Sequence, residues 1–198
     1  MDFLLGVMVV MFIFSASGSK DPSPSYLQKK LDPYLSQIQL SQIPQADFQL
    51  SYAQVEKFVK TYKPNFNDGD LKTLYETTVS TAKERNMDPR LALALMARES
   101  AFDPQAVSSA GAIGLGQIKP INYAAVGIDN PKDIAQNARG TILYLSDQLR
   151  RWNGYPNQTE LGLASYKEGY GAVYRANTTY KTDTAQYIRD IFKLRDSI

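Results

Sequence analysis

The sequence predicts a mainly or entirely α-helical fold, and three observations lead to that prediction. Apolar residues in the segment 68–198 recur every three or four positions, which is the spacing of one face of a helix. The periodic stretches begin at Asp, Asn or Thr, residues that cap helix N-termini. No two neighbouring stretches alternate apolar and polar residues as the strands of a hairpin do. We therefore expect five or six helices around the apolar run 91–97.

The first expected helix begins at Asp68 or Asp70, either of which can act as its N-cap, and stops near Asn86. The central helix opens at Asp88–Pro89, because Asp accepts from the first free N–H groups and proline has no N–H to leave unpaired. It continues with apolar residues on every face, which is typical of a helix that is buried all round.

Three more helices are expected in the second half of the chain. Asn130–Pro131 opens a helix that ends at Asn153–Gly154. Thr159 caps a short helix, after which the chain turns at residues 169–171. The last helix is expected to begin at Thr182 or Thr184.

Three segments of different composition divide the chain. We expect residues 1–18 to be a signal peptide or a membrane anchor, residues 19–67 a proline-containing linker or arm with short helices, and residues 68–198 the main compact domain. Small residues at positions 15–18 favour cleavage. The absence of Lys and Arg before the apolar run favours an anchor, which would contact the membrane through residues 3–16.

The chain has no cysteine and no histidine among its 198 residues. This composition excludes disulfides, thiol nucleophiles, His-based triads and the usual zinc sites, so we expect no metal and no cofactor. Any acid or base must be Asp, Glu, Lys or Tyr. The net charge is +2 and the Lys and Arg residues are dispersed, so nucleic acid is not an expected partner.

Glu99 lies where the apolar central helix reaches its C-terminal end. The negative end of the helix dipole and the neighbouring apolar surface both disfavour an ionised carboxylate there. We therefore expect a raised pKa, which suits a general acid near neutral pH. The alternative is a solvated glutamate at a helix end, since Glu is mostly exposed in proteins.

Three glycines, at positions 111, 114 and 116, precede Gln117. No Lys–Ser/Thr pair follows them and no apolar strand precedes them, so the segment is not a phosphate-binding loop. Glycines at this spacing permit a wall with few side chains, against which a bulky ligand can lie beside the Gln117 amide. A plain turn is the alternative.

These motifs resemble those of the lytic transglycosylases of the soluble, goose-type-lysozyme-like group (SLT domain), which cleave the glycan strands of peptidoglycan. The resemblance extends from about Leu71 to Phe192 and implies a lysozyme-like helical domain. The residues that carry it are Glu99–Pro104, Ser108, Gly111–Ala112, Gly114–Leu115, Gln117, Pro120, Asn137, Gly140, Tyr144–Leu145, Ala164–Tyr166, Gly169 and Tyr187–Ile188.

By this resemblance Glu99 is the single catalytic acid and base, and the partner is the peptidoglycan glycan strand. It would protonate the β-1,4 glycosidic oxygen between N-acetylmuramic acid and N-acetylglucosamine. The carboxylate would then take the proton of the muramic acid 6-hydroxyl, whose intramolecular attack leaves a 1,6-anhydro end. Because the substrate supplies the nucleophile, no second carboxylate is needed to activate water.

The resemblance also implies a substrate site around the acid. Ser108 and Gln117 would hold the acetamido group and nearby polar atoms of the sugar. Tyr166 would position Glu99, and Tyr187 would line the site, with core packing as the alternative for both tyrosines. Ser100 either caps the helix end or touches substrate.

Two residues depart from the family pattern. Gly116 stands where the family usually has methionine, which removes an apolar contact to the sugar. Lys167 stands where asparagine usually follows the tyrosine. Its ammonium would lower the pKa of Glu99, point to solvent, or bind a substrate carboxylate.

Two rival functions stay open. A hydrolytic muramidase on the same fold would need a second carboxylate, for which Asp103, Asp129 and Glu168 are the candidates. A non-catalytic wall-binding or virion structural protein would need none. The corresponding settings are the cell envelope, with a secretion apparatus as a further partner, or a phage virion with its components.

Overall fold

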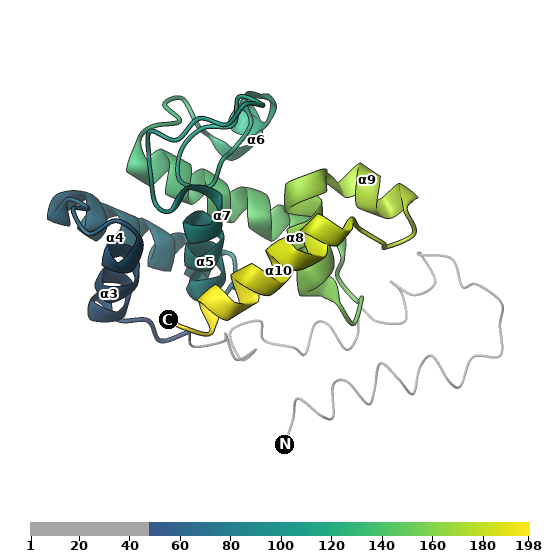
Figure 1. Ribbon diagram of the computed structural model, residues 1–198, viewed down its shortest axis with the longest axis horizontal. Helices are drawn as coiled ribbons and strands as arrows, with labels where there is room; N and C mark the ends of the chain where they lie inside the picture. Colours follow the sequence, from purple (N-terminus) through teal and green to yellow (C-terminus); the bar gives the residue numbers. More distant parts are fainter. Residues whose placement is uncertain (1–47) are drawn as a thin grey trace, which may run out of the picture. The chain divides into compact units, whose positions relative to one another are not determined.

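The computed structural model describes residues 48–198, and helices make up most of this part of the chain (Figure 1). Only isolated bridges in the segment 107–118 interrupt the helix-and-loop pattern of the described residues, so the predicted all-α class is confirmed. The expected signal or anchor, its membrane contact at residues 3–16 and most of the arm lie outside the described residues. Within residues 48–198, no helix has the length and apolar content needed to cross a membrane.

The first described helix, α3 (Tyr52–Tyr62), falls within the segment expected to be an arm, and it belongs to the compact unit Ala46–Ile198. Ser51 and Gln54 form a capping box at its start, in which each side chain accepts from the other residue's N–H. The buried face of α3 packs on α4 and consists of Val55, Phe58 and Val59. Residues 48–67 therefore contribute to the hydrophobic core.

Helix α4 (Asp68–Glu84) has a different N-cap from the two that the sequence suggested. The side-chain oxygen of Asn67 accepts from the N–H of Gly69 at 2.8 Å and of Asp70 at 3.1 Å. The prediction of Asp68 or Asp70 as the cap is wrong, because the preceding asparagine already satisfies these donors. Both aspartates instead lie in the first turn, where their charges favour the positive end of the helix dipole.

Helix α5 (Pro89–Ser100) is the predicted central helix. Asp88 caps it by accepting from the N–H of Arg90 at 3.0 Å, with Pro89 in the first turn, so the predicted start is confirmed. Residues 91–97 are all buried, and α4, α7 and α10 pack against the helix (Figure 1). Its last turn, which contains Glu99, leaves this core.

The remaining elements are η2 (Pro120–Asn122), α6 (Tyr123–Val126), α7 (Ile134–Arg151), α8 (Gln158–Glu168), α9 (Tyr170–Arg175) and α10 (Thr182–Arg195). The expected start of α7 at Asn130–Pro131 is wrong, because Asp133 caps it by accepting from the N–H of Gln136 at 2.8 Å. Asn130 instead accepts from Lys132 in the preceding turn. Thr159 lies inside α8 and is not its cap. Helix α10 begins at Thr182, one of the two threonines at which the sequence predicted its start.

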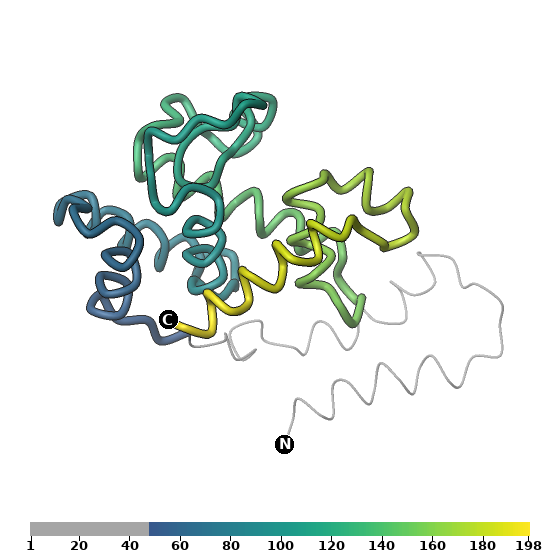
Figure 2. Tube along the Cα trace, viewed as in Figure 1, coloured from purple at the N-terminus to yellow at the C-terminus, as the bar shows by residue number. Residues whose placement is uncertain are grey.

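The arrangement of these helices brings four parts of the chain together. Helix α10 runs across α5 and α8, and the chain between α5 and α7 loops over the C-terminal end of α5 (Figure 1, Figure 2). Residues 48–198 contain eight α-helices, more than expected, because α6 and α9 are too short to show an apolar period. The end of α5, the glycine-containing segment, α8 and α10 therefore meet around Glu99.

Candidate active site

Glu99 occupies the last turn of α5, and its side chain is partly buried. Ala101 and Phe102 follow in the left-handed backbone region, with φ of 51° and 60°, which ends the helix and turns the chain towards the glycines. Burial raises the pKa of the Glu99 carboxyl above its usual value, in the predicted direction. The hydrogen bond from Tyr187 and the charges of two nearby cations oppose this rise.

Tyr187, from the middle of α10, donates a hydrogen bond from its hydroxyl to Oε1 of Glu99. The residue as a whole is 3% exposed. Burial, followed by the charge of Glu99, raises the pKa of the Tyr187 hydroxyl well above its usual value, so the hydroxyl is a neutral donor near pH 7. The sequence suggested that Tyr187 lines the site, and the structure places its hydroxyl on the carboxyl itself.

The glycine wall, residues 111–117, is fixed from behind by the buried side chain of Asn137. Asn137 Oδ1 accepts from the N–H of Gly116 at 3.0 Å. Its Nδ2 donates to the carbonyls of Ile113 at 3.0 Å and Pro131 at 2.8 Å. A Cβ at Gly114 would lie 2.3 Å from Asn137 Nδ2, so the absence of a side chain permits this close approach.

Two side chains attach the glycine wall to the helices beside it. Ser100 donates to the carbonyl of Leu115 at 2.8 Å, which holds the wall to α5. Tyr166 donates to the carbonyl of Gly116 at 2.7 Å, which holds the wall to α8. Tyr166 therefore makes its hydrogen bond to the wall, whereas Glu99 receives its hydrogen bond from α10. Burial, and then the charge of Glu99, raises the pKa of the Tyr166 hydroxyl, so the two groups are still electrostatic neighbours.

Ser108 and Gln117, which the resemblance assigns to sugar binding, use part of their hydrogen-bonding capacity on the wall. Ser108 Oγ accepts from the N–H of Ala112 at 3.0 Å. Gln117 donates from Nε2 to the carbonyls of Gly114 at 2.9 Å and Ala106 at 3.2 Å. Among residues 48–198, the Ser108 hydroxyl hydrogen and Gln117 Oε1 have no partner, so these atoms are available to a ligand.

Two cations lie over the ring of Tyr187, and the sequence drew attention to one of them. Lys167 Nζ lies 5.0 Å from the ring centroid and the Arg98 guanidinium carbon 5.5 Å. Lys167 pairs with Asp183 at 3.0 Å, and Arg98 pairs with Asp190 at 3.2 Å. Burial raises the pKa of the Glu99 carboxyl, and the charge of Lys167 opposes that rise.

Gly116, one of the two departures from the family pattern, stands against Thr141 of α7. A Cβ on Gly116 would lie 2.0 Å from Oγ1 and 2.6 Å from Cγ2 of Thr141. Thr141 is fully buried and donates to the carbonyl of Asn137 at 2.7 Å. The volume that a methionine at position 116 would enter is therefore already occupied by the threonine.

Gly116→Met is expected to lower the free energy of unfolding by about 1–3 kcal/mol, the usual cost of overpacking a core. Thr141→Gly removes the clashing atoms, but it adds the penalty of a glycine inside a helix, about 1 kcal/mol relative to alanine, to the loss of a buried, hydrogen-bonded side chain. Urea unfolding of the double variant should show a favourable coupling of about 1 kcal/mol or more, because the two positions share one volume. Additive losses would contradict this sharing.

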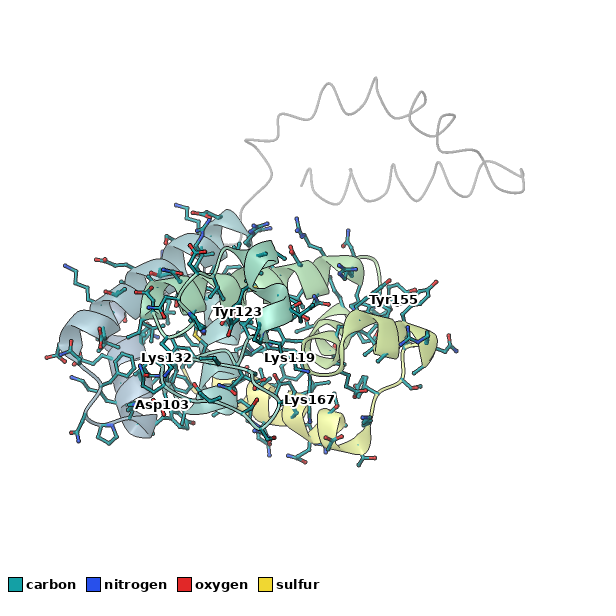
Figure 3. All side chains as sticks on the ribbon, turned by 90° about the horizontal axis from the view of Figure 1, so that it is seen from above. Asp103, Lys119, Tyr123, Lys132, Tyr155 and Lys167 are labelled. Carbon is teal, nitrogen blue, oxygen red and sulfur yellow. The ribbon has the colours of Figure 1, made fainter. Side chains whose placement is uncertain are left out.

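Asp103, the first carboxylate that a hydrolase on this fold might recruit, is bound by the lysine that follows α3. It pairs with Lys63 at 2.8 Å, and this hydrogen bond holds the pKa of the Asp103 carboxyl below its usual value. Figure 3 shows Asp103 on the side of α3 and α4, away from Lys167, which lies by α10.

The two other acidic candidates do not act on Glu99. Asp129 is exposed, and Glu168 accepts from the N–H of Lys181 at 3.0 Å. Within the described residues, the charged groups that shift the pKa of Glu99 are two cations and no carboxylate. The part of the chain that the structure describes also holds no group of acidic side chains arranged to bind a metal ion.

Comparison with known families gives a match to the transglycosylase SLT domain over residues 77–188, which is more than half of the chain. The matched range contains Glu99, the glycine wall, Tyr166 and Tyr187.

Two curated relatives illustrate the similarity. The chain is 31% identical over 108 residues to a protein named transglycosylase from Enterobacteria phage PRD1, a match that covers 54% of this chain and 38% of the relative. It is 36% identical over 93 residues to the membrane-bound lytic murein transglycosylase F 1 of Alkalilimnicola ehrlichii, covering 46% of this chain and 19% of the relative. The matched region is thus well under half of each relative.

Among solved structures, the chain is similar to an inactive mutant of the lytic transglycosylase Slt from Pseudomonas aeruginosa. The TM-score is 0.52 at 25% sequence identity, and the match covers 61% of this chain and 23% of that chain. The predicted lysozyme-like helical fold is therefore confirmed.

Proposed function

This chain belongs to the transglycosylase SLT domain family, and from that membership we propose that it is a peptidoglycan lytic transglycosylase. It would cleave the β-1,4 bond between N-acetylmuramic acid and N-acetylglucosamine and leave a 1,6-anhydromuramic acid end. The observation that carries the proposal is the partly buried carboxyl group of Glu99, which accepts a hydrogen bond from a buried tyrosine hydroxyl and on which no second carboxylate among residues 48–198 acts.

In the first step Glu99 acts as general acid. The pKa that burial raises keeps a larger fraction of the carboxyl protonated near neutral pH than at an exposed glutamate. The proton passes to the glycosidic oxygen, the bond from that oxygen to C1 of muramic acid breaks, and N-acetylglucosamine leaves. The 2-acetamido carbonyl of muramic acid stabilises the electron-poor C1.

In the second step the same group acts as base. The Glu99 carboxylate takes the proton of the muramic acid 6-hydroxyl, and O6 forms a bond to C1. Glu99 ends the cycle protonated, and no water is consumed. The hydrogen bond from Tyr187 favours the carboxylate form, so it stabilises the enzyme between the two steps.

The glycine wall supports this chemistry by leaving room for a sugar ring beside Glu99. We propose that the free Gln117 Oε1 accepts from the acetamido N–H and that the Ser108 hydroxyl donates to a sugar oxygen. Ser100 and Tyr166 would act indirectly, because their hydroxyls hold the wall in place.

The experiment that tests this function is mass spectrometry of the fragments that the full chain releases from purified peptidoglycan. Ends lighter than a reducing sugar by one water are expected. Reducing ends would identify a hydrolytic muramidase instead. Binding without release would favour the non-catalytic wall-binding or virion protein.

The proposed setting is the cell wall, opened locally at the bacterial envelope or during phage entry. The names of the two relatives, a phage transglycosylase and a membrane-bound lytic murein transglycosylase, support both settings. Mass spectrometry of the N-terminal peptide of the protein from its natural source tests the role of the expected anchor. A chain that begins at Ser19 has lost that anchor.

A further inference from the structure

One face of α10 is directed at the candidate acid and bears three polar side chains. Asp183, Tyr187 and Asp190 are four and three residues apart, the spacing that places side chains on one face of a helix. Tyr187 is buried and reaches Glu99, whereas the two aspartates are more exposed, with side-chain exposures of 68% and 32%.

Each aspartate holds a cation from a different helix over the same ring. Asp183 binds Lys167 of α8, and Asp190 binds Arg98 of α5. Both cations lie within the roughly 6 Å of the Tyr187 ring centroid at which cation–π attraction acts. Figure 3 shows Lys167 beside α10, the helix that contains Tyr187. Two positive charges, each paired with an aspartate of α10, therefore lie over the ring whose hydroxyl binds Glu99.

We propose that Lys167, tethered by Asp183, is a positioning residue that strengthens the hydrogen bond from the Tyr187 phenol to ionised Glu99. This inference rests on the proposed function and adds which residues stabilise the ionised form of its acid–base group, Glu99. Arg98, tethered by Asp190, acts on the same ring from α5.

The physical reason is the polarisation of the phenol. A cation over the ring draws electron density from the phenol oxygen, so the O–H becomes a stronger donor to a carboxylate. The ionised form of Glu99 gains more from that donor than the protonated form does. Lys167 is only 29% exposed in its side chain, so its charge is less screened by water than at an open surface.

The groups that act on Glu99 come from three helices. Arg98 belongs to α5 itself, Tyr166 and Lys167 belong to α8, and Tyr187 belongs to α10. The described parts of α4 and α7, which also pack on α5, contribute no charge that shifts the pKa of Glu99. The glycine wall contains no ionisable side chain.

The direct test is a titration of the Glu99 carboxyl by carbon NMR in the full chain labelled at glutamate, with the signal assigned by its loss in Glu99→Gln. Lys167→Met is expected to raise the pKa of Glu99 by about 0.5 unit, less than the 1–3 units of a cation in direct contact. Lys167→Arg should keep most of the wild-type value. Lys72→Met, which removes an exposed ion-paired lysine of α4, is the matched control and should leave the titration unchanged.

A second background separates polarisation of the phenol from a plain charge effect. In Tyr187→Phe the hydroxyl is absent, so the further change Lys167→Met is expected to shift the titration by less than half as much as in the wild type. An equal shift in both backgrounds would overturn the proposal, because Lys167 would then act on Glu99 directly through space. Absence of any shift in the wild-type background would overturn it as well.

Kinetics on soluble, uncross-linked glycan strands give the third readout. Lys167→Met should move the alkaline limb of the pH profile of kcat to higher pH by about 0.5 unit, the same shift as in the titration, with KM within about twofold of wild type. A raised KM with an unchanged titration would show that Lys167 binds a substrate carboxylate, and this would overturn the proposal. If the wild type releases no anhydro ends but the titrations behave as expected, the transglycosylase function fails while the coupling of Lys167, Tyr187 and Glu99 stands.

Discussion

Glu99→Gln is expected to lower the rate of glycan cleavage by about 10²–10⁴-fold, the usual contribution of general acid–base catalysis. Glutamine has the shape of the carboxyl, but it neither donates a proton to the glycosidic oxygen nor removes one from the 6-hydroxyl. The measurement is the initial rate of anhydro-end release from soluble glycan strands. The matched control is Glu76→Gln, an exposed glutamate on α4, which should keep its rate within about twofold. A Glu99→Gln rate above about one tenth of wild type would contradict the assignment.

The same variant should unfold at a higher temperature than wild type at pH 7. Burial raises the pKa of Glu99 in the folded state above its unfolded value, so folding at neutral pH buries a charge at a cost in free energy. That cost is absent below the unfolded pKa, about 4.3, where the carboxyl is protonated in both states. It grows as the pH rises towards the folded pKa. The difference in Tm should therefore shrink as the pH is lowered through about 4.3, and a difference that does not depend on pH would argue against a raised pKa.

Asn137→Ala is expected to lower the free energy of unfolding by about 2–4 kcal/mol. The substitution removes three hydrogen bonds, one buried and two partly buried, and leaves the N–H of Gly116 and the carbonyl of Ile113 without their partner. Each hydrogen bond contributes about 0.5–1.5 kcal/mol, and an unsatisfied buried group adds to the loss. At about 2–4 °C per kcal/mol for a domain of this size, Tm should fall by roughly 4–16 °C.

The control for this variant is Asn153→Ala, an exposed asparagine after α7, which should unfold within about 0.5 kcal/mol of wild type. Activity should also fall in Asn137→Ala, because the glycine wall that Asn137 fixes lies beside Glu99. A loss of stability below about 1 kcal/mol would mean that the wall is held by its other attachments, the hydroxyls of Ser100 and Tyr166.

Local signals predicted the parts of the fold that depend on neighbouring residues. Asp88–Pro89 predicted the start of α5, because a cap and a first-turn proline act within one turn. The predicted caps of α4 and α7 were wrong, since several capping residues stand close together in each case. Local sequence does not choose among Asn67, Asp68 and Asp70, whereas the path of the preceding chain does.

The candidate site shows the same division. Glu99 and its raised pKa followed from one helix and its apolar pattern. The partner of Glu99 did not, because the hydrogen bond from Tyr187 joins positions far apart in the sequence and depends on how α10 packs on α5. The spacing of Asp183, Tyr187 and Asp190 was a usable signal, since it marks a polar stripe on a helix that is otherwise amphipathic. No local sequence signal indicated that Arg98 of α5 would contact these residues of α10.

The hydrogen bond between Glu99 and Tyr187 spans 88 positions, and this separation sets an order of events when the protein is made. At a translation rate of about 5–20 residues per second, Tyr187 is added roughly 4–18 s after Glu99. During that interval the nascent chain contains the glutamate but not the phenol, and Asp190 follows three residues later. The carboxyl therefore reaches its tuned environment only after the ribosome has completed the last helix, so chains released before α10 contain the acid without its partner.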